Sequence, residues 1–394
     1  WEEPLRSKAE KAGPDERRKM AYSRYGLVER PDDLKHRPLQ YVVDDAGNWT
    51  MNCLACHQGK VAGKTYAGVP NSLYALETLT EEVAETKDRL HKPHTRMERG
   101  MSLMPLGTTN GTTNAVMFGV ALLALRDPDL NLRSGFPTLT SHDHDAPAWW
   151  NFHRRRSLYS DGFAMKTHRA LMQFLLDPEN KAAKFREWEG DFKDIYAWLD
   201  SLTPPKYPWL LDAALVGKGH ELFDRQCARC HGNAGRDERF PNKIIPIETV
   251  GTDPVRLNAL TPDQRKAYGA SWFGEYGKQP LVEDPGGYVP PPLDGIWASA
   301  PYFHNGSVPT LWHVLHPDAR PKVWLRTEDG YDQKRVGLEV QTFDSLPPEA
   351  RASRKERRRY FDTTKEGKSA SGHRFPDVLD EDEKKALLEY LKTI

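Results

Sequence analysis

Cysteine is scarce in this chain, which has only four among its 394 residues. Neither sign of charge is in excess, because 56 basic residues balance 56 acidic ones. A balanced charge gives no indication of a nucleic-acid or membrane-surface partner. The mean hydropathy is −0.72, and no segment approaches the roughly 18 consecutive apolar residues of a membrane-spanning helix. We therefore expect no membrane span and no nucleic acid.

The four cysteines all lie in two copies of one motif, Cys53-Leu-Ala-Cys56-His57 and Cys227-Ala-Arg-Cys230-His231. The C-x-x-C-H spacing is typical of covalent c-type haem attachment. Two thiols on a short helical turn can reach both vinyl groups of a porphyrin, and the next imidazole can coordinate the iron. Paired zinc ligands and a redox dithiol are alternatives, but neither explains the histidine after each second cysteine. We predict two covalent haem c groups, with His57 and His231 as proximal ligands.

Haem attachment also bears on the compartment. Covalent attachment of haem c follows export, so we predict a periplasmic or otherwise extracytoplasmic protein whose signal peptide has been removed. The first residues, Trp1-Glu2-Glu3, lead into a charged segment and not into an apolar leader. With every thiol assigned to a haem motif, we expect no disulfide.

The spacing of the motifs predicts a mainly α fold with two cytochrome c-like domains, each around one covalently bound haem, and long irregular loops. We place a charged N-terminal arm at 1–38, with some helix around Glu16–Tyr25, the first haem domain at 39–205 and the second at 206–394. Amphipathic segments at 192–202 and 383–394 each resemble the last helix of a cytochrome c unit. Each would pack on the helix before its haem motif, which in the second unit is 217–226.

Three further segments have helical signals. Thr78-Leu-Thr-Glu81 has the pattern of a capping box and predicts a helix from there to about Leu90. The apolar run 115–125 predicts a buried helix. In the third segment, Met165, His168, Met172 and Leu175 fall at helical spacing on one face.

One stretch resembles a known family. Residues 291–311, Pro-Pro-Leu-Asp-Gly-Ile-Trp-Ala-Ser-Ala-Pro-Tyr-Phe-His-Asn-Gly-Ser-Val-Pro-Thr-Leu, resemble the second-domain signature of the di-haem cytochrome c peroxidase and MauG superfamily. The closest resemblance is to the rubber-oxygenase-like branch. Asp145-Ala-Pro-Ala-Trp-Trp150 with the following Arg154–Arg156, the order of the haem motifs, and Gly367-Lys-Ser-Ala-Ser-Gly-His373 extend the resemblance over roughly 50–394.

The resemblance implies a division of labour between the haems. One iron is six-coordinate and relays electrons, and the other has an accessible position where peroxide or dioxygen reacts. The relay haem would be the second, with His373 as its distal ligand; the alternative for His373 is an exposed loop histidine. No methionine follows Met172, so the usual alternative ligand is missing from the second half.

The distal side of the first haem is less clear. Peroxidases of this superfamily place a distal histidine shortly after the first motif, but 70–74 has none, which puts plain peroxidase chemistry in doubt. By resemblance, Trp150, Met117 and Phe118 would line the distal pocket, with ordinary core packing as the alternative. His168 or Met165 could cap the iron, although His168 also fits a core histidine.

Three other sites remain as hypotheses. The resemblance implies a calcium held by the backbone carbonyls of Ser299 and Pro301, which are hard oxygen ligands. His142-Asp-His-Asp145 could bind a metal or form an ordinary turn. The basic segment 351–359 is either a solvated helix face or a docking patch for an acidic electron carrier.

Together these observations predict an extracytoplasmic di-haem c-type oxidoreductase that acts on peroxide or dioxygen and exchanges electrons with a redox partner protein or small cytochrome. The alternative is a non-catalytic di-haem electron-transfer cytochrome. A sensor or gas-binding protein without turnover is a third possibility.

Overall fold

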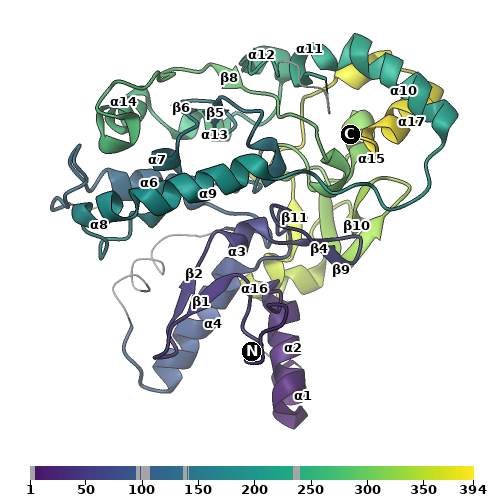
Figure 1. Ribbon diagram of the computed structural model, residues 1–394. Helices are drawn as coiled ribbons and strands as arrows, with labels where there is room; N and C mark the ends of the chain where they lie inside the picture. Colours follow the sequence, from purple (N-terminus) through teal and green to yellow (C-terminus); the bar gives the residue numbers. More distant parts are fainter. Residues whose placement is uncertain (1–4, 95–97, 99–106, 136–139, 141, 234–239) are drawn as a thin grey trace.

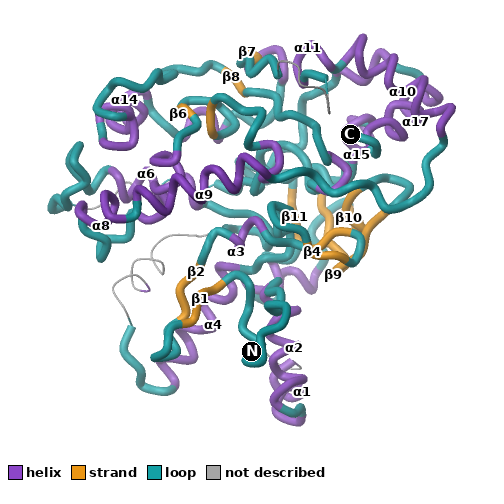
Figure 2. Tube along the Cα trace, viewed as in Figure 1, coloured by secondary structure: helices purple, strands orange, loops and turns teal. Residues whose placement is uncertain are grey.

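The computed structural model describes residues 5–94, 98, 107–135, 140, 142–233 and 240–394. Helices joined by long loops supply most of its regular structure, and strands are confined to small sheets (Figure 2). This confirms the prediction of a mainly α protein, while its division into two haem domains stays a prediction. Within the described residues, no helix has the length and apolar character needed to cross a membrane.

The N-terminal region carries two helices, two small hairpins, the first haem motif and a longer helix. In order they are α1 (Leu5–Lys11), α2 (Pro14–Tyr25), β1 (Tyr41–Val43), β2 (Trp49–Met51), α3 (Leu54–His57), β3 (Lys60–Val61), β4 (Lys64–Thr65) and α4 (Leu76–Arg89). The expected helix in the arm is confirmed by α2. Tyr25 and Leu27 pack with Ala55 of the first motif in one apolar cluster, so this end of the arm lies against the haem motif.

The next region consists of short elements followed by one long helix. They are α6 (Ala115–Leu123), the 3-10 turn η1 (Trp149–Asn151), β5 (Ser157–Leu158), β6 (Ala164–Met165), α7 (His168–Leu171), η2 (Met172–Leu175), α8 (Ala182–Glu187) and α9 (Glu189–Ser201). The predicted buried helix at 115–125 is confirmed by α6. The predicted helical stripe from Met165 to Leu175 is wrong, because strand, α-helix and 3-10 turn divide it.

The second haem motif and the helices around it follow. They are α10 (Ala213–Gln226), α11 (Ala228–His231), β7 (Ile245–Pro246), α12 (Ile247–Val250), α13 (Val255–Ala259), α14 (Pro262–Ala270), η3 (Trp272–Gly274) and β8 (Gly287–Tyr288).

The C-terminal region contains the three-stranded sheet, whose order is β10-β9-β11 with antiparallel pairing. Its elements are η4 (Ile296–Ala298), α15 (Leu311–Leu315), η5 (Pro317–Ala319), β9 (Val323–Asp332), β10 (Gly337–Phe343), η6 (Pro348–Arg351), α16 (Arg354–Arg357), β11 (Tyr360–Asp362), η7 (Phe375–Val378) and α17 (Glu381–Leu391).

The helices α10 and α17 lie side by side, which confirms the predicted packing of the last helix on the helix before the second motif (Figure 1). Gly219 permits the close approach, because a methyl group at this position would lie 2.1 Å from the carbonyl oxygen of Ala386. The first half does not repeat this arrangement. A β-hairpin precedes its haem motif, and α9 packs on α7 and η1.

The capping-box prediction at Thr78–Glu81 is wrong. Helix α4 already begins at Leu76, and Thr78 lies buried inside it. Leu76 is buried in the cluster beside the first haem motif, and this packing extends the helix beyond the local capping signal. Glu81 turns to Arg358, whose guanidinium holds the pKa of that carboxyl below its usual range.

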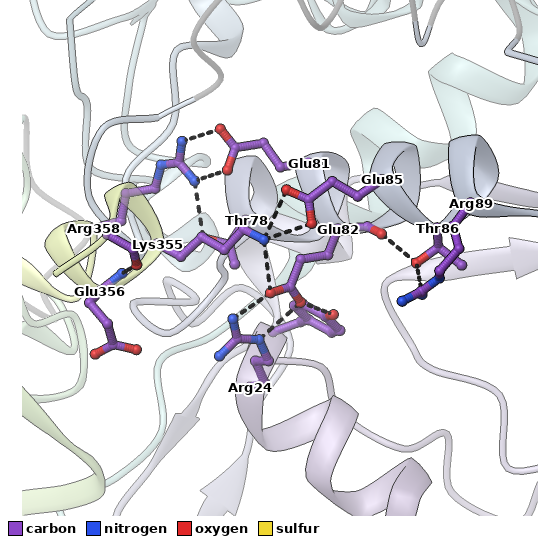
Figure 3. A network of polar contacts seen from close by, with 12 residues as sticks. Arg24, Thr78, Glu81, Glu82, Glu85, Thr86, Arg89, Lys355, Glu356 and Arg358 are labelled. Carbon is purple, nitrogen blue, oxygen red and sulfur yellow. Dashed lines mark hydrogen bonds and ion pairs between the residues drawn. The ribbon is translucent and has the colours of Figure 1, made fainter. Parts of the chain in front are cut away.

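The basic segment 351–359 faces acidic residues of α4 (Figure 3). Arg358 lies 2.6 Å from Glu81, and the Lys355 amine lies 2.8 Å from Glu85. Glu82 of α4 pairs with both Arg24 of α2, at 3.0 Å, and Lys355, at 3.5 Å. Much of the charge that suggested a docking patch therefore joins distant parts of the chain.

The apolar core crosses the predicted domain boundary. One cluster joins Val69 and Trp150 to Trp297, Phe223 and many residues of the C-terminal region. Another joins α6 and Phe185 to apolar residues within 259–281. Asp161 is fully buried and pairs with the buried Arg256 at 3.1 Å and Arg265 at 3.0 Å. The two halves thus pack as one body, and the boundary at 205/206 stays a prediction.

Candidate haem sites

Each C-x-x-C-H motif forms a single helical turn, as its spacing predicted. The first turn is α3 and the second is α11. In both turns the histidine backbone N–H donates to the carbonyl of the first cysteine, at 3.3 Å for His57 and 3.0 Å for His231. This closure keeps the two cysteines and the histidine of each motif within one turn. It is the arrangement that two thioether bonds and one axial ligand require.

A proline carbonyl orients each of these histidines. The Nδ1–H of His57 donates to the carbonyl of Pro147 over 3.0 Å, and that of His231 donates to Pro291 over 2.8 Å. A hydrogen bond at Nδ1 fixes the tautomer and the ring orientation of an imidazole, and leaves Nε2 with its lone pair. Among the described residues, none hydrogen-bonds to Nε2 of either histidine. Both rings are therefore set up as ligands.

The protonation state agrees with this role. Removal from water lowers the pKa of His57 to about 4, and also lowers the pKa of His231 below its ordinary value. A ligating imidazole must be neutral. Both rings are thus neutral at physiological pH, and the donor set of each motif fits a covalent haem.

His373 faces His231 across the second site. Their ring centroids are 6.2 Å apart, with an angle of 65° between the ring planes. An iron bonded to two imidazole nitrogens, each at roughly 2 Å, needs about this separation between the two rings. Removal from water, reinforced by the facing His231, lowers the pKa of His373 to about 3. The geometry supports His373 as the distal ligand.

Backbone contacts hold the loop of His373 in place. The backbone N–H of His373 donates to Val250 over 2.6 Å, and Arg320 donates to the carbonyls of Ala370 and Gly372 over 2.7 Å each. Gly372 has a φ of +77°. A methyl group there would lie 2.2 Å from the backbone of Gly251. Only glycine lets the loop approach this closely, so the local sequence Gly372-His373 places the imidazole.

The first site has different surroundings. Trp149 stacks on His57 with ring centroids 4.6 Å apart, and the exposed edge of Trp198 meets Trp149 at 5.6 Å. Helix α6 begins beside the first motif, because Thr113, two residues before the helix, hydrogen-bonds to the Cys56 thiol. Burial of this thiol raises its pKa to about 11, in spite of the hydrogen bond. In α6, Met117 is buried and Phe118 is half-buried. The prediction that these two residues line a distal pocket stays open, and their position close to the motif is compatible with it.

Two other residues proposed for the first site have partners of their own. Trp150 is fully buried between the two halves, and its indole N–H donates to the carbonyl of Asp294 over 2.6 Å. His168 has its Nε2 2.9 Å from the carboxylate of Glu189, which also pairs with Arg169. Their roles at the first haem stay predictions. The ring that the structure places against His57 is that of Trp149, which the sequence signalled only as part of the Trp-Trp pair.

The remaining metal hypotheses gain no support. His142 and His144 are buried with ring centroids 4.4 Å apart, and Asp143 pairs with Lys368 at 2.9 Å. In the described part of the chain, no cluster of three or more His, Cys, Asp or Glu side chains is arranged to hold a metal ion. The backbone calcium site at Ser299 and Pro301 stays a prediction; these residues flank Ala300 in the buried loop after η4.

The motifs and their geometry fit a c-type cytochrome. A family model described as RoxA-like, cytochrome c-like matches residues 287–325. This segment contains Pro291, the hydrogen-bond acceptor of His231, together with most of the signature at 291–311. The match supports a relationship to the rubber-oxygenase-like cytochromes c, and a cytochrome c-like domain implies bound haem c.

Two curated relatives match longer parts of the chain. Uncharacterized protein y4iM of Sinorhizobium fredii is 30% identical over 237 residues, which are 50% of this chain and 52% of the relative. Uncharacterized protein y4iJ of the same organism is 29% identical over 260 residues, 49% of this chain and 41% of the relative. The chain thus spans about half the length of the curated relatives it matches.

Proposed function

We propose that the protein is an extracytoplasmic di-haem c-type oxidoreductase, with a relay haem at His231/His373 and a haem at His57 that activates peroxide or dioxygen. The observation that carries the proposal is the difference between the two sites. His231 has a second imidazole 6.2 Å away, whereas the ring in contact with His57 is an indole stacked at 4.6 Å. An indole stacked on the side of a proximal ligand supplies no bond to iron.

The residues of the chain would hold and separate the two irons. Cys53, Cys56 and His57 would bind the first haem, and the C-x-x-C-H motif at 227–231 would bind the second together with His373. When bound, haem iron supplies the electron transfer and the chemistry of the oxidant. The chain supplies neutral imidazoles oriented by Pro147 and Pro291, and a largely apolar core between the sites. We also propose a small cytochrome or another redox protein as electron partner.

The test begins with mass spectrometry of the purified holoprotein. We expect a mass increase of two haems, one of which is lost when Cys53 and Cys56 are both replaced by alanine. The oxidised protein should show one low-spin and one high-spin haem, and cyanide or carbon monoxide should bind once per chain. Loss of the high-spin signal in the Cys53→Ala/Cys56→Ala variant would assign the reactive site.

The second candidate is a di-haem electron carrier without catalysis. The hydrogen-bonded proline carbonyl behind each proximal histidine favours it equally, because this feature serves any c-type haem. Two low-spin haems that bind neither cyanide nor carbon monoxide would establish the carrier and overturn the oxidoreductase. A chain that carries no covalent haem would overturn both.

A further inference from the structure

Arg154 connects the two halves of the molecule at the proximal side of the second haem site. It follows the turn η1, which belongs to the first half of the chain. Its Nη1 donates to both carboxylate oxygens of Asp294 at 3.0 Å, and its Nη2 donates to the carbonyl of Asn233 at 2.7 Å. The side chains of Arg154 and Asp294 are only 8% and 10% exposed. This is a nearly buried, hydrogen-bonded ion pair.

The two partners of Arg154 flank His231. Asn233 lies two residues after His231, and Asp294 lies three residues after Pro291, whose carbonyl accepts the Nδ1–H of His231 at 2.8 Å. The carbonyl of Asp294 also accepts the indole N–H of Trp150 at 2.6 Å. Arg154 and Trp150 together therefore fix the loop that orients the proximal ligand.

We propose that Arg154 is a positioning residue for the second haem site, which clamps the segments on both sides of His231 and sets how readily an iron held there accepts an electron. This inference rests on the proposed function, because it requires a haem at His231. Two physical effects contribute. The Nδ1 hydrogen bond tunes the donor strength of an imidazole ligand, and a nearby charge shifts the electron affinity of the iron.

The direction of the effect follows from the charges. In the native protein the guanidinium compensates the Asp294 carboxylate. Arg154→Gln removes a positive charge beside Asp294, and loss of a nearby positive charge opposes addition of an electron to the iron. We expect the ratio of reduced to oxidised second haem to fall about tenfold at a fixed potential, which corresponds to about 59 mV for one electron. Asp294→Asn removes a negative charge at the same place and should shift the ratio the other way.

The measurement is a spectroelectrochemical titration of the holoprotein, in which the low-spin and high-spin bands report the second and first haem separately. Arg156→Gln is the matched control, because it removes the same charge from an exposed side chain only two residues further along the chain. We expect both haems of this control to titrate like the native protein. Arg154→Lys keeps the charge but cannot hold both partners, and should restore most of the native potential.

Two results would overturn the proposal: second-haem potentials of the Arg154→Gln and Asp294→Asn variants that equal that of Arg156→Gln, or shifts that affect both haems alike. If Arg154→Gln does not fold, the opposite shift expected for Asp294→Asn still decides. Mass spectrometry separates this failure from that of the proposed function. A protein with two haems but unchanged potentials refutes only the role of Arg154, whereas a protein without haem at His231 refutes the function itself.

Discussion

Replacement of His373 by glycine tests the assignment of the second site most directly. Glycine is preferable to alanine, because His373 has a φ of +49°, a conformation that glycine adopts without strain. The backbone hydrogen bond from residue 373 to Val250 does not involve the side chain, so it persists in the variant. The change therefore removes the imidazole and leaves the loop in place.

The expected magnitude follows from the geometry of the two sites. The 6.2 Å between the rings of His231 and His373 fits two imidazoles on one iron. Removal of the His373 imidazole therefore affects one of the two proposed haems. We expect half of the total haem to change from low-spin to high-spin, and added free imidazole to restore the low-spin form.

The assay is absorption and electron paramagnetic resonance spectroscopy of the oxidised protein, normalised to its haem content. His220→Ala is a suitable control, because His220 lies on α10 against Tyr390, with ring centroids 4.9 Å apart, and belongs to neither site. The control should keep the native spectrum. A His373→Gly protein with two haems and an unchanged low-spin fraction would refute the assignment of His373.

Three further predictions concern the support of the two sites. Gly372→Ala should destabilise the loop by about 1–3 kcal/mol, because of its φ of +77° and the close approach to Gly251; a high-spin fraction between those of the native and His373→Gly proteins checks it. Asp161→Asn leaves two buried guanidinium groups without their anion, so the free energy of unfolding in urea should fall by about 3–5 kcal/mol, whereas an equal midpoint would contradict a structural ion pair. Burial lowers the pKa of His142 to about 4 and that of His144 well below its ordinary value. At acidic pH the unfolded chain therefore binds more protons than the folded protein does. The stability from these histidines is complete above about pH 6.5 and falls as the pH decreases toward 4, by about 1.4 kcal/mol per pH unit for each histidine. His142→Gln should remove the contribution of one histidine, about 1.4 kcal/mol per pH unit, from the slope of stability against pH. An unchanged slope would exclude His142 as a source of the pH dependence.

Local spacing allowed the prediction of the features closest to the haems. The motif turns α3 and α11 and the helix before Cys227 follow from short-range pattern. The packing of that helix against the last helix follows from the resemblance of 383–394 to the last helix of a cytochrome c unit. The family resemblance of 367–373 implies His373 as a ligand, and the neighbouring Gly372 supplies the positive φ of +77° that the loop requires. These features depend on residues that are neighbours in the sequence, and a single chain displays them.

Long-range packing produced the features that the sequence did not predict. Helix α4 begins before its apparent capping box because Leu76 is buried against the first motif. Two cations of the basic segment, Lys355 and Arg358, pair with glutamates more than 250 positions earlier in the chain, such as Glu81 for Arg358. Trp149 and Trp150 are adjacent and chemically identical, and only the turn η1 decides which ring meets His57.

The histidines of the two motifs are oriented alike, and this narrows where the difference between the two sites can lie. In each half a proline carbonyl orients the histidine, and three residues later Trp150 and Asp294 bond to each other over 2.6 Å. Because both proximal ligands share this support, it cannot by itself make one haem a relay and the other reactive. The proposed distinction therefore depends on features that the two sites do not share, such as His373, whose ring faces that of His231 at 6.2 Å.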